Sequence, residues 1–254
     1  MNNQNARWAP YGLQGGRVEG QPAEEPEIIV ISGRDLRAFI FRVYVSSLLL
    51  CVVSSIPWII LSALVVDVYE DIPVPPFVWL LLAFIILTIL SCVRQTPATT
   101  LFCWGMVVAS LFFITLYGAY YMHLVNVWVL LVSMIASGAL LFLLHLYGAR
   151  SPEVLLPNLL CTCCVFLLAT ITMIVLIILF LVIRDLRYML AFAIVFVILI
   201  VFMAPFQARY ICGRLRQVPY GETASCANGI YLHFVFLIGS MLVFALYFDY
   251  VNNE

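Results

Sequence analysis

Apolar stretches, each about as long as a bilayer is thick, recur along most of the chain and are separated by short polar segments. Seven of them are predicted to be membrane-spanning helices, at about residues 43–66, 74–93, 98–121, 124–147, 155–183, 188–206 and 230–248. A segment inside the hydrocarbon must pair its own backbone amides, and a helix of about 20 residues does so. The pattern therefore predicts an all-α, polytopic membrane protein built as a seven-transmembrane-helix bundle.

The composition leaves little room for a soluble domain. Hydrophobic residues make up 65% of the chain and charged residues 10%, whereas about a quarter of the residues of a soluble protein are charged. The longest polar stretch is the N-terminal tail, residues 1–38, which is rich in Gly, Pro, Asn, Gln and Glu and is predicted to be disordered. Residues 39–254 are predicted to form the membrane domain. Since the first apolar run follows this tail, we expect an uncleaved anchor and no cleavable signal peptide.

Arginine supplies all twelve basic residues, and its distribution predicts the orientation of the chain. Positive residues near the ends of spans favour the cytosolic side. Eight lie on the side of the N-terminus and two on the other: Arg34, Arg37, Arg42, Arg94, Arg150, Arg209, Arg214 and Arg216 against Arg184 and Arg187. The bias predicts a cytosolic N-terminus and, after seven crossings, a C-terminus in a lumen or outside the cell. If the last span is re-entrant, the chain crosses six times and the C-terminus is cytosolic.

Few ionisable residues are predicted to lie at membrane depth. Asp67, Asp185 and Asp249 stand at span ends, where water solvates them, and the histidines are too dispersed for a metal site. The sequence therefore predicts no catalytic residues, no metal and no cofactor, and the protein is expected not to be an enzyme. Gln207 and His233 are the candidate functional residues. His233 is either a neutral imidazole hydrogen-bonded within the bundle or a proton- or ion-sensitive gate, because histidine titrates near physiological pH. Gln207, where the sixth span meets the cytosol, is either a functional residue or simply solvated at the interface.

Most of the eight cysteines lie within apolar spans, where we expect them to behave as small hydrophobes. The run Cys-Thr-Cys-Cys at 161–164 lacks the second Cys/His pair that a zinc site requires, and S-acylation is left open for it. Cys212 and Cys226 lie in a predicted loop, which the arginine distribution places in the reducing cytosol.

The fourth predicted span carries a cluster of small residues, Ser133, Ala136, Ser137, Gly138 and Ala139. Small side chains let the backbones of two membrane helices approach closely. The cluster predicts either tight packing inside the bundle or a face used between copies of the chain.

Three short stretches carry family-like motifs: Arg-Ala-Phe-Ile-Phe-Arg-Val-Tyr at 37–44, Phe-Gln-Ala-Arg-Tyr-Ile-Cys-Gly at 206–213 and Ala-Asn-Gly-Ile-Tyr-Leu-His at 227–233. They resemble motifs of the transmembrane Bax-inhibitor-motif (Lifeguard) family: an Arg before Phe-Ile-Arg-Lys-Val-Tyr, then Tyr-Asp-Thr-Gln-x-Ile-x-Gly, then Ala-Leu-Asn-Leu-Tyr-Leu-Asp. The motif residues are Arg37, Phe39, Arg42, Tyr44 and Tyr231. The resemblance extends over about residues 35–250 and implies a seven-helix bundle of Bax-inhibitor type.

The resemblance also shows where this chain departs from the family. Family members carry two aspartates in the last two helices, which form a pH-sensitive latch over a calcium-leak path. Gln207 and His233 occupy these latch positions here. Neither supplies the negative charge that a divalent cation favours, so calcium leak by the usual route is not expected.

With these departures, its tail and its arginine-only basic residues, the chain most resembles the seven-transmembrane proteins of cytomegaloviruses that descend from the family. The resemblance implies a non-enzymatic viral protein of host endomembranes (endoplasmic reticulum, Golgi or endosomes) or the plasma membrane. It would modulate host membrane-protein traffic and remove surface immune ligands, which blunts natural-killer recognition. The implied partners are the lipid bilayer, host membrane proteins and related viral membrane proteins, without nucleic acid.

The alternative is a calcium-leak channel, or an apoptosis and stress modulator, of the Bax-inhibitor type. A captured G-protein-coupled receptor is rejected, because that class needs an external N-terminus and an Asn-Pro-x-x-Tyr motif, and the last span contains no proline.

Overall fold

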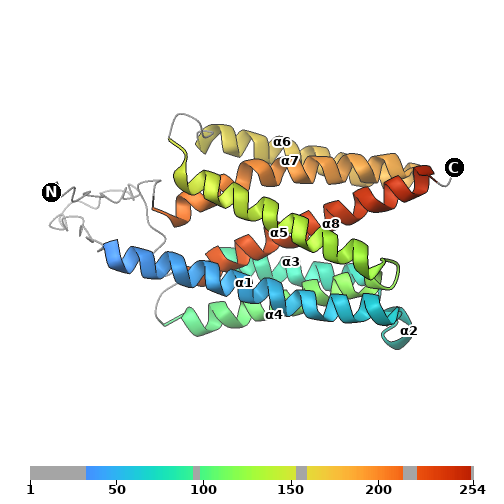
Figure 1. The fold of residues 1–254 in the computed structure, drawn as a ribbon, viewed down its shortest axis with the longest axis horizontal. Helices are drawn as coiled ribbons and strands as arrows, with labels where there is room; N and C mark the ends of the chain where they lie inside the picture. The colour runs from blue at the N-terminus through green and yellow to red at the C-terminus, as the bar shows by residue number, and fades with distance from the viewer. Residues whose placement is uncertain (1–32, 94–97, 153–158, 214–221, 253–254) are drawn as a thin grey trace, which may run out of the picture.

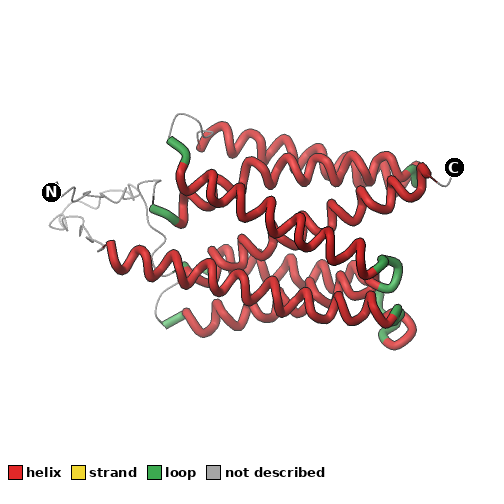
Figure 2. Tube along the Cα trace, in the orientation of Figure 1, coloured by secondary structure: helices red, strands yellow, loops and turns green. Residues whose placement is uncertain are grey.

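The computed structural model describes residues 33–93, 98–152, 159–213 and 222–252. Within these ranges the chain is helical apart from short turns and contains no strand (Figure 2). The predicted tail, residues 1–38, lies outside the described residues except for 33–38, which belong to the first helix. The all-α class predicted from the hydrophobic pattern is therefore confirmed.

Within the described ranges, seven long helices and one short helix follow one another. Their bounds are α1 Gly33–Leu64, α2 Val68–Asp71, α3 Pro76–Cys92, α4 Thr100–Met122, α5 Val127–Arg150, α6 Leu159–Ile183, α7 Leu186–Ile211 and α8 Thr223–Asn252. Six of them (α1, α4, α5, α6, α7 and α8) are long and apolar enough to cross a membrane, whereas α3 is an apolar helix of 17 residues. A multi-pass membrane protein is thus supported, with six clear spans.

The helix ends differ from the predicted span ends wherever polar residues continue a helix. The predicted loop 207–229 is wrong over most of its described length, because α7 continues to Ile211 and α8 already begins at Thr223. Likewise α1 begins at Gly33, ten residues before the predicted first span. Hydropathy marks where the chain leaves the hydrocarbon, while a helix can continue into water as long as its backbone bonds are made.

Successive long helices run in opposite directions, so the start of α1 and the end of α8 lie at opposite ends of the bundle (Figure 1). The end that holds the start of α1 carries most of the described arginines and is called the arginine-rich end. The opposite end, which holds α2, is called the α2 end. The arginines of the arginine-rich end are Arg34, Arg37, Arg42, Arg150 and Arg209, while Arg184 and Arg187 lie at the α2 end.

Polar residues at the α2 end act as helix caps. The side chains of Asp67, Asn126 and Asp185 accept hydrogen bonds from the backbone N–H two residues later, at the starts of α2, α5 and α7. Such capping satisfies donors that a helix start leaves unpaired. Arg184 adopts a left-handed backbone, with a φ of 56°, and turns the chain from α6 into α7. The acids predicted to be merely solvated therefore include two that begin helices.

The core of the bundle forms around α8, which packs against α1, α4, α5 and α7. Tyr231 and Leu237 of α8 are completely buried. In contrast, α6 lies at the edge of the bundle and packs mainly against α7 (Figure 1). The centre of the fold is thus the last helix, and the sixth is the most exposed to lipid.

Candidate functional site

Gln207 and His233, the two residues singled out from the sequence, lie along the α7–α8 interface. The Gln207 side-chain Nε2 donates a hydrogen bond of 3.1 Å to the carbonyl oxygen of Cys226. The same amide lies against Gly229, where a methyl group would overlap it. His233 follows Gly229 by four residues, one turn further along the same face of α8. Gln207 of α7 thus packs against α8 about one helical turn before His233.

His145 of α5, which sequence reasoning had set aside, lies close enough to His233 for the two rings to interact electrostatically. The His145 side chain is buried, and its Nδ1 lies 3.0 Å from the carbonyl oxygen of Leu141. A carbonyl oxygen only accepts, so Nδ1 carries the hydrogen and Nε2 is left as an acceptor. The antiparallel course of α5 and α8 brings together two histidines that are far apart in the sequence.

Tyr44 of α1 completes a group that we call the polar cluster: Tyr44, His145, Gln207 and His233. The rings of Tyr44 and His145 pack edge to face, with their centroids 5.8 Å apart and their planes at 84°. Three buried atoms of the cluster, His145 Nε2, His233 Nδ1 and Gln207 Oε1, have no hydrogen-bond partner among the described residues. Buried polar atoms of this kind can bind a small polar molecule or an ion.

The cluster lies near the arginine-rich end, where further polar side chains are packed. Arg209, two residues after Gln207, is buried, with only 7% of its surface exposed. The Tyr210 hydroxyl donates a 3.2 Å hydrogen bond to the Glu222 carboxylate, which ties the end of α7 to the start of α8. The sequence alone gave no sign that Arg209 would be buried, because arginines near span ends are usually solvated.

The other motif residues fall into two groups. Phe39 and Tyr231 are buried in the packing of the bundle, and the Tyr231 hydroxyl lies close to Ser54 of α1 and Thr115 of α4. Arg37 and Arg42 are exposed at the arginine-rich end, where Arg37 Nε donates to the Gly33 carbonyl oxygen at 3.2 Å. The motif residues therefore have structural positions, and only Tyr44 joins the polar cluster.

The described residues contain no group of three His, Cys, Asp or Glu side chains arranged to hold a metal ion. His123, the third histidine, lies at the α2 end, with its Nδ1 3.9 Å from Asp67 Oδ1. Among the described residues, Cys212 and Cys226 are not joined in a disulfide.

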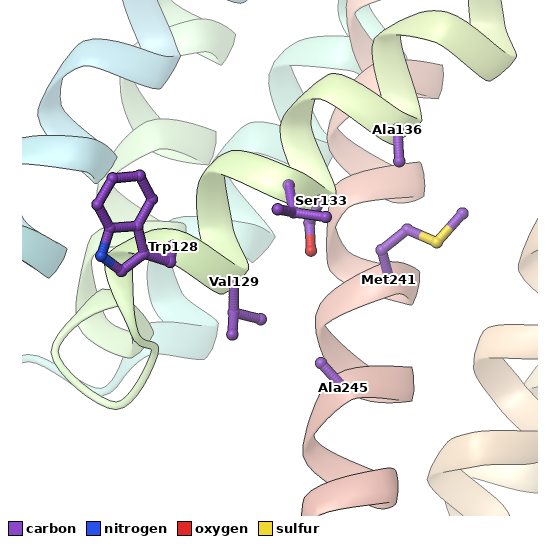
Figure 3. Close-up of a pocket in the computed structure, with 7 residues that line it drawn as sticks. Trp128, Val129, Ser133, Ala136, Met241 and Ala245 are labelled. Atoms are coloured by element: carbon purple, nitrogen blue, oxygen red, sulfur yellow. The ribbon is translucent and has the colours of Figure 1, made fainter.

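A shallow apolar groove of about 410 Å³ opens between α5 and α8, on the half of the bundle nearer the α2 end. Figure 3 shows the side chains that line it, which are Trp128, Val129, Val132, Ser133, Ala136, Met241 and Ala245. The groove exists because Ser133, Ala136 and Ala245 are too small to fill the space between the two helices. The predicted small-residue cluster is therefore divided: Ser133 and Ser137 are buried, while Ala136 is exposed.

Comparison of the chain with protein-family models, with curated proteins and with solved structures finds no match. The likeness to the Bax-inhibitor family therefore rests on the three motifs, and it stays a prediction. Function has to be inferred from the geometry of the chain itself.

Proposed function

We propose that this chain is a non-enzymatic, multi-pass membrane protein that binds other membrane proteins within the bilayer and alters their traffic. The α5–α8 groove is the observation that supports this function most directly. Its lining is apolar, it is open to the outside of the bundle, and both helices contribute small side chains to it, Ser133 and Ala136 from α5 and Ala245 from α8. The six long apolar helices support the membrane location.

The groove has the chemistry of a contact site for a transmembrane helix. Lipid tails are as apolar as leucine, so helices associate in membranes by close packing, and small residues at the contact make such packing possible. Ala136 and Ala245 provide this on the two walls of the groove, one from each helix. We propose that the partner is a host membrane protein, and the motif resemblance favours an immune ligand that a viral protein removes from the cell surface.

The proposed topology has seven crossings and a cytosolic N-terminus. The 17 residues of α3 extend about 26 Å at 1.5 Å per residue, slightly less than the hydrocarbon core, and local thinning of the bilayer accommodates such a helix. The helix also packs along α4 within the bundle. The excess of arginine at one end supports a cytosolic location for that end.

Filling the groove tests this proposal. In cells that express the full chain, we expect the surface level of one or more host membrane proteins to fall, as measured by surface proteomics. Ala136→Trp is expected to restore those levels and to reduce partner co-purification about tenfold, the effect of losing about 1.4 kcal/mol of binding free energy. Ile135→Trp is the matched control, because Ile135 is 72% exposed and does not line the groove.

Two results would contradict the proposal. If the parent chain changes no surface protein, the traffic function is wrong. If Ala136→Trp and Ile135→Trp both behave like the parent, the groove is not the contact site.

A calcium-leak or stress-modulating function of the Bax-inhibitor type is the second candidate, and the polar cluster favours it. The three unpartnered buried polar atoms lie among α5, α7 and α8, where a polar path would need side chains of this kind. Here we expect expression to lower stored calcium and His233→Leu to change the leak rate, whereas His123→Leu at the α2 end leaves it unchanged. A calcium indicator in the lumen of the endoplasmic reticulum measures both, and store content equal to that of control cells would eliminate the leak.

A further inference from the structure

The eight cysteines differ in how far their side chains are exposed. Four are exposed, namely Cys92, Cys161, Cys163 and Cys164, and all four lie toward the arginine-rich end. Cys92 is the last residue of α3, and the other three belong to the first two turns of α6. The remaining four are buried or partly buried. Exposed thiols are thus concentrated at one end of the lipid-facing surface.

The helical geometry of α6 turns its three thiols away from the bundle. Among the α6 side chains that the structure describes, Thr162 alone is buried. Successive residues are 100° apart around a helix, so Cys161 and Cys163 flank Thr162 at 100° on either side, and Cys164 lies 200° from it. Since α6 packs mainly against α7, all three thiols are accessible from the membrane side.

The depth of these thiols is also restricted. Cys161 is the third residue of α6, so this thiol lies less than one turn from the start of the helix. Cys164 is three residues further on, about 4.5 Å along the helix axis. Such a position leaves a thiol within reach of the bilayer surface, while a chain attached to it would run among the lipid tails.

From these positions we infer that Cys161, Cys163 and Cys164 form an S-acylation site that carries long-chain fatty acyl groups. The inference rests on the proposed topology, in which the arginine-rich end is cytosolic and therefore meets cytosolic acyl-coenzyme A. Juxtamembrane cysteines of this kind are typical acceptors.

The acyl transfer is balanced without an oxidant or reductant. The cysteine sulfur attacks the carbonyl carbon of a long-chain acyl-coenzyme A, directly or after the acyl group has passed to a host acyltransferase. A new carbon–sulfur bond forms, the bond to the coenzyme A sulfur breaks, and the proton of the cysteine thiol leaves with coenzyme A as its free thiol. The attached chain then lies in the lipid beside α6, the helix with the least protein packing around it.

Acyl exchange on the full chain expressed in mammalian cells tests the inference. Free thiols are blocked, thioesters are cleaved with hydroxylamine, and the released thiols react with a mass-tagged maleimide. We expect a hydroxylamine-dependent mass shift that largely disappears in the variant Cys161→Ser, Cys163→Ser, Cys164→Ser. The matched control is Cys51→Ser with Cys103→Ser, since Cys51 is partly buried and Cys103 fully buried; this variant should keep the full shift.

Three other outcomes would contradict the proposed acylation site. A chain with no hydroxylamine-dependent shift is not acylated, and a shift that survives the triple substitution comes from other cysteines. An adduct cleaved by dithiothreitol but not by hydroxylamine would be a disulfide. Labelling the same thiols with an impermeant maleimide, after selective permeabilisation of the plasma membrane, separates the causes. If the thiols are unlabelled, the proposed topology is wrong. If they are labelled but carry no acyl group, the acylation site alone is wrong.

Discussion

Replacing Gly148 with alanine is expected to force α5 away from α7 and to destabilise the bundle by about 3 kcal/mol or more. A methyl group on Gly148 would lie 2.6 Å from the Cα atom of Pro205 and 2.8 Å from its carbonyl carbon, and would overlap its carbonyl oxygen. These are backbone atoms, so no side-chain rotation relieves the overlap. A close-packed interior has no space into which the helices could shift without losing other contacts. The loss should be visible as a lower unfolding temperature of the purified protein in detergent.

Gly105→Ala is the matched control for Gly148→Ala. Gly105 is also helical, and a Cβ atom built on it meets nothing within 4 Å. This variant should unfold at or slightly above the temperature of the parent, because alanine favours a helix over glycine. If Gly148→Ala unfolds at the same temperature as Gly105→Ala, the close approach of α5 and α7 is wrong.

The same contact explains why Pro205 does not end α7. A proline inside a helix removes one backbone hydrogen bond and usually kinks or stops the helix. The hydrophobic pattern predicted a span that ends at about residue 206. In the structure α7 continues to Ile211, and Pro205 is buried against Gly148. Hydropathy located the apolar part of this helix well, whereas its extension depends on a partner helix that no local pattern reveals.

The helices were more predictable than the contacts between them. A long apolar run has few conformations available in lipid, so the hydrophobic pattern located all seven long helices. Their neighbours depend on side-chain shape, which explains why the sequence gave Gln207 and His233 but not the approach of His145 to His233. The same limit applies to the cysteines. Sequence position alone treated Cys103 and Cys163 alike, whereas packing buries the first and exposes the second.

Truncating Trp58 to alanine is the second change for which we expect a large effect, a loss of about 3–5 kcal/mol of stability. Trp58 is 3% exposed and joins α1 to α4 in two ways. Its indole lies so close to Gly118 that a Cβ atom there would come within 2.7 Å of the ring, and its Nε1 donates a 2.8 Å hydrogen bond to the Thr115 carbonyl oxygen. Alanine would leave a cavity that the rigid helices cannot close, and the hydrogen bond would be lost as well.

Trp58→Phe separates the two contributions. Phenylalanine keeps most of the packing but donates no hydrogen bond, so we expect it to lose about 1 kcal/mol from the missing bond and less than alanine in total. Trp128→Ala is the control, because Trp128 is 73% exposed on α5 and its removal should change stability by about 0.5 kcal/mol or less. Thermal unfolding in detergent should therefore rank the proteins as parent and Trp128→Ala, then Trp58→Phe, then Trp58→Ala. Equal unfolding temperatures for Trp58→Ala and Trp128→Ala would show that the α1–α4 contact does not hold these helices together.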